Sequence, residues 1–103
     1  MEGSTKTRIA SIEAKLEELD KLSANMTEDR FSLVFNNIRM KAEDGDSEST
    51  RIIDAMTAFH NTLKRGETVE EIFERSKEQP ELQQIIIDYI HAMRHIVLAS
   101  RSL

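Results

Sequence analysis

The sequence predicts an all-α fold, a small bundle of four to five helices in one domain spanning residues 1–103. Apolar residues recur at spacings of three and four, the helical pattern, along nearly the whole chain. Only 3 Gly and 1 Pro interrupt it, too few for the many turns of a β-sandwich or barrel. The hydrophobic fraction of 39% and the charged fraction of 32% indicate amphipathic helices around a modest core, because a disordered chain carries less apolar content.

A first helix is predicted over residues 4–22. Its apolar residues occupy the a and d positions of a heptad: Ile9, Ile12, Leu16 and Leu19. In the same frame Arg8 and Lys15 take g positions, whereas Glu13 and Asp20 take e positions. Opposite charges at g and at the e position five residues later are what a parallel homodimeric coiled coil needs. This helix therefore either pairs in a coiled coil or packs as an amphipathic helix inside its own bundle.

Residues 23–25 break the pattern and divide residues 1–26 from a helical bundle over residues 27–103. Thr27 is expected to cap a second helix that runs to Glu43. One face of this helix is apolar: Phe31, Val34, Phe35 and Ile38. Leu33 and Met40 lie on another face and indicate a second contact surface. The alternative is that the first two helices form one long bent helix.

The acidic segment 43–49 is predicted to be a loop, with Ser47 or Ser49 capping a third helix. The apolar face of this helix is Ile52, Met56, Phe59 and Leu63. Lys64 and Arg65 in its last turn, followed by Gly66, predict where it ends.

Thr68 and Glu71 form a capping-box pattern that opens a short fourth helix running to Lys77. Gln79 ends this helix because a residue before proline disfavours helical backbone angles. Pro80 then suits the first turn of the last helix.

The last helix, from Pro80 onward, is apolar around far more than half of its circumference. One broad face carries Leu82, Ile85, Ile86, Tyr89, Ile90, Met93, Ile96 and Val97. Ile87 and Leu98 extend this face beyond the arc of an ordinary surface helix. The helix is therefore expected at the centre of the bundle or at an oligomer interface.

The heptad pattern of the first helix and the broad apolar arc of the last helix together predict a non-catalytic protein–protein interaction module. We expect a homo-oligomerising adaptor or regulatory protein. The predicted interface consists of Ile9, Ile12, Leu16, Leu19, Ile86, Ile87, Ile90, Val97 and Leu98. The alternative is a small acidic chaperone or inhibitor that binds one specific partner, such as a secretion substrate, a toxin or a basic nucleic-acid-binding protein.

The chain carries no catalytic motif and no cofactor fingerprint, so we expect neither enzymatic activity nor a cofactor. A metal site is the less favoured reading of Asp88, His91 and His95, whose spacing places them on one side of the last helix. A net charge of −5 argues against binding to nucleic acid. The absence of Cys, of a signal peptide and of about 18 consecutive apolar residues indicates a cytoplasmic protein that does not span a membrane.

Overall fold

The computed structural model describes the backbone of residues 2–102 and the side chains of residues 7–102. This part of the chain contains no strand and five helices, which confirms the predicted all-α bundle. The helices are α1 Glu2–Ser23, α2 Glu28–Glu43, α3 Ser47–Thr62, α4 Val69–Ser76 and α5 Glu81–Ser100.

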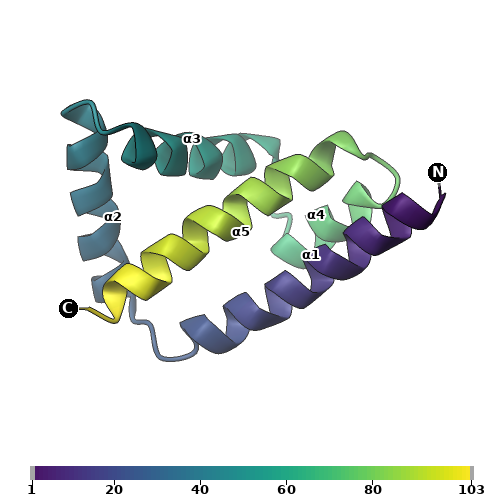
Figure 1. Cartoon of the computed structure of the whole chain (residues 1–103), viewed down its shortest axis with the longest axis horizontal. Helices are drawn as coiled ribbons and strands as arrows, with labels where there is room; N and C mark the ends of the chain where they lie inside the picture. The colour runs from purple at the N-terminus through teal and green to yellow at the C-terminus, as the bar shows by residue number, and fades with distance from the viewer. Residues whose placement is uncertain (1, 103) are drawn as a thin grey trace.

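The last helix, α5, is the centre of the fold, and each of the other four helices packs against it (Figure 1). The sequence predicts this helix either at the centre of the bundle or at an oligomer interface, and the central position is confirmed. α3 packs along both halves of α5, α4 packs near its N-terminal half, and α2 stands across its C-terminal end (Figure 1). The broad face of α5 is thus covered mainly by the chain's own helices, because four amphipathic helices each contribute an apolar stripe.

α1 runs parallel to α5, with both helices starting at the same end of the molecule (Figure 1). At that end, the Arg8 guanidinium donates a hydrogen bond to Gln84 Oε1 at 3.1 Å. Further along, Arg94 pairs with Glu18 at 3.4 Å. The apolar heptad stripe of α1 therefore has a parallel partner helix within its own chain.

The core divides into two clusters along α5. The first joins α1, α3, α4 and the N-terminal half of α5 through Ile12, Phe59, Ile72, Phe73, Leu82, Ile86 and Ile90. The second joins α2, α3 and the C-terminal half of α5 through Val34, Ile38, Ile52, Ala92 and Ile96. Since α3 and α5 contribute to both clusters, these two helices connect the two ends of the bundle.

The helix starts at Thr27 and Thr68 are as predicted. The Thr27 hydroxyl accepts a hydrogen bond from the Arg30 backbone N–H at 3.2 Å and begins α2 as a separate helix. The turn before it excludes one long bent helix. At α4, Thr68 and Glu71 form the complete capping box.

The predicted ends of the third helix are wrong at both termini. Its cap is Asp46, whose carboxylate accepts a hydrogen bond from the Ser49 N–H at 2.9 Å. The Ser49 hydroxyl first, and its N–H second, lower the pKa of Asp46. α3 ends at Thr62, because Leu63 has extended backbone angles, and Lys64 therefore lies outside it.

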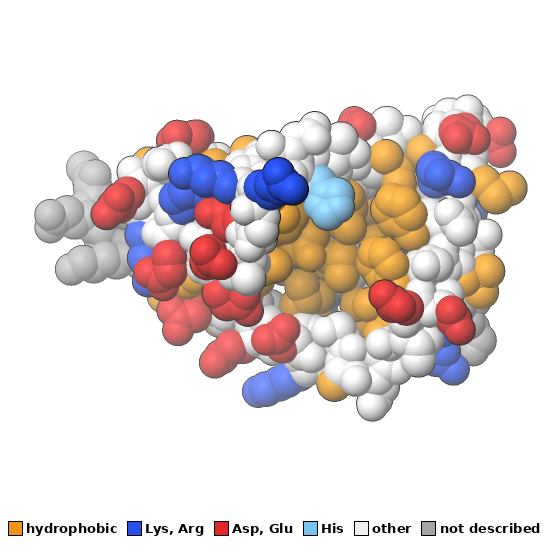
Figure 2. All heavy atoms as spheres, turned by 180° about the vertical axis from the view of Figure 1, so that it is seen from behind, with side chains coloured by type: hydrophobic (Ala, Val, Ile, Leu, Met, Phe, Trp, Pro, Cys, Tyr) orange, Lys and Arg blue, Asp and Glu red, His pale blue; other side chains and the backbone are white. Residues whose placement is uncertain are grey.

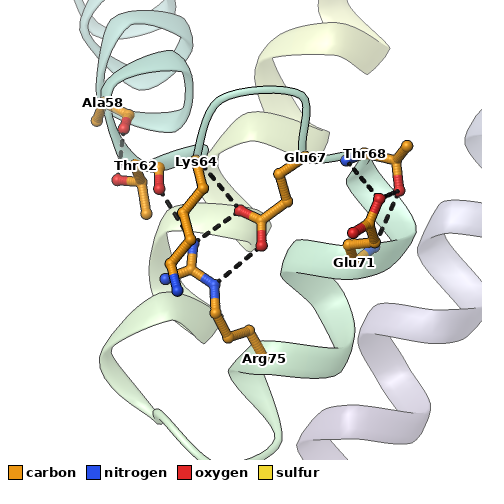
Figure 3. A network of polar contacts seen from close by, with 7 residues as sticks. All are labelled: Ala58, Thr62, Lys64, Glu67, Thr68, Glu71 and Arg75. Atoms are coloured by element: carbon orange, nitrogen blue, oxygen red, sulfur yellow. Dashed lines mark hydrogen bonds and ion pairs between the residues drawn. The ribbon is translucent and has the colours of Figure 1, made fainter.

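The connection between α3 and α4 is organised by Arg75 (Figure 3). Its guanidinium donates to both carboxylate oxygens of Glu67, at 2.8 and 3.1 Å, and to the Thr62 carbonyl at 3.1 Å. Glu67 also accepts a hydrogen bond from the Lys64 N–H. That N–H, followed by Arg75, lowers the pKa of Glu67. The network ties the end of α3 to α4 and so sets the orientation of the short helix.

α4 is also tied to α5 by a buried polar contact. The Gln83 side chain is 1% exposed, and its amide nitrogen donates to the Ser76 carbonyl at 3.0 Å. A buried amide costs free energy unless it is hydrogen-bonded, so this contact favours one arrangement of the α4–α5 junction.

Candidate binding grooves

The structure buries most of the nine predicted interface residues inside the chain itself. Five of them lie in the interior: Ile12, Leu19, Ile86, Ile90 and Val97. Ile9, Leu16 and Ile87 are partly buried and pack against the first core cluster. Leu98 is 42% exposed. Leu98 is therefore the most exposed of the nine, and an interface made by all nine would require α1 to leave α5.

The large apolar side chains with the highest exposure among the described residues are Leu33 at 52%, Met40 at 60% and Leu98. Leu33 and Met40 are seven residues apart on α2, so they share one face of that helix. This is the second face that the sequence indicates, and it points away from the core.

One groove lies between α3 and α5, and we name it the histidine groove. It has a volume of about 630 Å³ and is lined by Glu48, Arg51, Ile52, Asp54, Ala55, Ala58, Asp88, His91, Ala92 and His95. Its floor is made largely of alanines, and its rim carries charges of both signs. The apolar side chains of this groove are therefore small, apart from Ile52.

The histidine groove contains all three residues of the metal hypothesis, yet they do not form a metal-ligand cluster within the described residues. His95 lies 3.6 Å from Glu48 of α3 and is half-exposed. Asp88 accepts a hydrogen bond from Gln84 at 2.9 Å. Helical spacing places Asp88, His91 and His95 on one side of α5. Asp88 is hydrogen-bonded to Gln84 within α5, whereas His95 faces Glu48 of α3.

A second groove lies between α1 and α4, with α5 as its floor, and we name it the acidic groove. It has a volume of about 620 Å³. Its apolar lining is Leu16, Leu19, Val69, Phe73, Tyr89 and Met93. Its polar lining is Glu13, Glu17, Asp20, Ser23, Glu70, Glu74 and Lys77. Seen from behind, the molecule has a hollow with visible apolar side chains; acidic side chains gather to one side of it, and a histidine and basic side chains lie at its upper edge (Figure 2).

The floor of the acidic groove is rigidly held. The Tyr89 ring stacks on Phe59, with ring centroids 3.7 Å apart and planes at 13°. Burial raises the pKa of the Tyr89 hydroxyl, which therefore remains neutral at physiological pH. Met93 beside it is partly buried and also packs against the second core cluster. The floor thus continues the protein core to the surface.

Sequence reasoning missed this groove because its two walls are about 50 residues apart in the chain. The signal was present in each wall: carboxylates at Glu13 and Glu17, and again at Glu70 and Glu74, each pair four residues apart on a helix. Only the placement of α1 and α4 on the same side of α5 brings these pairs together around apolar side chains.

Comparison with protein-family models, with curated proteins and with solved structures gives no match to this chain. Among the described residues, no helix combines the length and the apolar character that crossing a membrane requires. The chemistry of the two grooves is therefore the basis for a functional proposal.

Proposed function

We propose that this protein is a non-catalytic module that binds another protein through the acidic groove. The single observation that carries the proposal is an open apolar floor bordered by carboxylates on two different helices. Apolar floors with a polar rim are typical of protein-binding surfaces, since the floor supplies affinity and the rim supplies orientation. The proposal includes a cytoplasmic location and a regulatory or chaperone-like role toward the partner.

The parallel packing of α1 on α5 supports partner binding over a coiled-coil homodimer. Ile12 is 0% and Leu19 is 8% exposed beneath this packing. Pairing two copies through the α1 heptads would first expose these side chains, and burying a leucine or isoleucine is worth about 1.5–3 kcal/mol each. The acidic groove requires no such opening.

Site-specific photo-crosslinking tests the proposal. Ser23→p-benzoylphenylalanine places the crosslinker in the acidic groove without changing its charge, and Asp54→p-benzoylphenylalanine places it in the histidine groove. In lysate of the source organism we expect one heterologous protein, identified by mass spectrometry, to be captured at Ser23 and not at Asp54. Equal capture at both positions, or none at Ser23, would overturn the proposal.

Self-association is the second candidate, and the exposed pair Leu33 and Met40 on α2 favours it. Two copies that covered these side chains would remove them from water without opening the bundle. We expect light scattering to detect a dimer that Leu33→Ser/Met40→Ser abolishes and that Leu98→Ser retains. A wild-type protein that remains monomeric at millimolar concentration would exclude this candidate.

A further inference from the structure

The acidic groove is long enough to hold one additional helix of about three turns. Its α1 wall runs from Glu13 to Ser23, about 15 Å along the helix axis at 1.5 Å per residue. Across the described residues, no Cα atom of α1 comes within 8 Å of one in α4, so the two walls do not close over α5. About three turns of an added helix would match this length, with the side chains of one face reaching the floor.

The apolar lining of the acidic groove favours a ligand helix that has one apolar face. Phe73, Tyr89 and Met93 line the groove with two rings and a thioether; Phe73 is 8% exposed and the other two are partly buried. Methionine and aromatic side chains adapt to leucine-sized anchors and are enriched where helices dock in grooves. A helix that offers apolar residues at i, i+3, i+4 and i+7 would place one such stripe on this floor.

The carboxylates at the rim of the acidic groove favour a ligand that carries positive charge. The carboxylates of Glu13, Glu17, Asp20 and Glu70 have no basic side chain within 4.0 Å among the described residues. The fifth carboxylate, that of Glu74, pairs with Lys77 at 2.9 Å. Lys77 is the single basic residue of the lining, and it also lies 5.2 Å from the centroid of the Phe73 ring. The rim therefore has an unbalanced negative charge on both of its walls.

From these observations we propose that the acidic groove binds one basic amphipathic helix of the partner protein, apolar face down and with lysine or arginine against both walls. This inference rests on the proposed function, which it deepens by naming the chemistry of the partner. Charge complementarity of this kind accelerates association and selects against acidic partners. Phosphate-bearing ligands and anionic membranes are repelled by the same rim.

A direct test uses a synthetic helical peptide of about four turns, with leucine at i, i+3, i+4 and i+7 and lysine elsewhere. We expect saturable binding by fluorescence anisotropy, weakened at least about fivefold as salt rises from 50 to 300 mM. A second peptide with glutamate at every lysine position should not bind. Equal binding of both peptides would overturn the assigned charge preference.

Matched charge reversals locate the peptide. Glu17→Lys/Glu70→Lys reverses one carboxylate on each wall of the acidic groove, and we expect affinity to fall at least about tenfold. Asp54→Lys/Asp88→Lys makes the same change in net charge in the histidine groove and should alter affinity by less than about threefold. Circular dichroism of both variants checks that the helices are retained. Equal losses in the two variants would contradict the assigned site.

The methionine methyl groups provide an independent readout that needs no substitution in the groove. In a ¹³C-methyl NMR titration with the lysine peptide, we expect the Met93 signal to shift and the exposed Met40 signal to stay. A shift at Met40 alone would overturn the site. Loss of signal at Met93 with increasing protein concentration, without peptide, would show that a second copy fills the groove and would overturn the partner helix.

The two proposals fail in different ways. If Ser23 crosslinks a partner but the lysine peptide does not bind, the basic-helix inference falls and the proposed function stands. If crosslinking at Ser23 and Asp54 is equal, the proposed function falls, whatever the peptide does.

Discussion

The two grooves beside α5 have nearly the same volume, about 620 and 630 Å³, yet they are built in opposite ways. In the histidine groove, α3 packs directly on α5 and alanines such as Ala55 and Ala92 line the seam. Small side chains let two helices approach closely, so the apolar contact is completed within the chain. In the acidic groove, α1 and α4 each pack on α5 while their Cα atoms stay more than 8 Å apart. Larger apolar side chains line the space between them, among them Tyr89 and Met93, which are partly buried.

Two grooves of nearly equal volume in one small bundle thus differ in what they can bind. What distinguishes the two grooves is the size of their apolar side chains: mainly alanines in the histidine groove, and leucine, aromatic and methionine side chains in the acidic groove. Charge adds to the difference: the rim of the histidine groove carries both signs, whereas the rim of the acidic groove is almost entirely negative.

The largest expected effect tests whether the two core clusters beneath the grooves unfold together as one cooperative unit. Ile86 in the first cluster and Ile96 in the second are both 0% exposed. We expect Ile86→Ala and Ile96→Ala each to lower the free energy of unfolding by about 2–5 kcal/mol, because each leaves a cavity. Urea denaturation followed by circular dichroism should show one transition in both variants. Two separate transitions would mean that the ends of the bundle unfold independently.

The next effect tests the alanine seam of the histidine groove. Ala92 is 3% exposed, and we expect Ala92→Leu to destabilise the protein by about 1–3 kcal/mol because the larger side chain overpacks the α3–α5 contact. The matched control is Ala58→Leu at an exposed position of the same groove, where we expect a change within about 0.5 kcal/mol. Similar stabilities for the two variants would contradict a closely packed seam.

A smaller effect concerns α4, one wall of the acidic groove. Thr68→Ala removes the hydroxyl that accepts the Glu71 N–H, and we expect a loss of about 1 kcal/mol by thermal denaturation. The control, Thr50→Ala, removes a hydroxyl that caps no helix and should change stability by less than about 0.5 kcal/mol. A Thr68 variant as stable as wild type would show that packing on α5 alone holds α4.

The smallest effect is the pH dependence of the Glu67–Arg75 network. The folded state lowers the pKa of Glu67 below 4.5, so its stabilising contribution is present above pH 4.5 and is lost as the pH falls through the folded pKa. We therefore expect Glu67→Gln to lower the melting temperature at pH 7 and to converge toward wild type below pH 4. Glu78→Gln, at an exposed position, is the control. A difference that stays constant with pH would contradict the assignment.

Local features of the fold were predictable because they depend on residues close in sequence. The capping box at Thr68 and the start at Thr27 involve groups three residues apart, and both are confirmed. The errors at α3 also have local causes. Asp46 and the nearby serines are all good caps, and the sequence does not rank them. Lys64 favours a helix end by charge, but Leu63 already leaves the helical conformation.

The amino-acid sequence alone determined that the protein is helical and which helices carry apolar stripes, because helical periodicity and capping depend on residues close together in the sequence. The tertiary structure alone decided which helix covers which stripe. The heptad of α1 is covered by α5 of the same chain, in the parallel orientation that its charges predict for a second copy. An apolar stripe specifies that it must be buried and not what buries it. For the same reason the acidic groove arises only where the fold places α1 beside α4 and leaves the floor between them open.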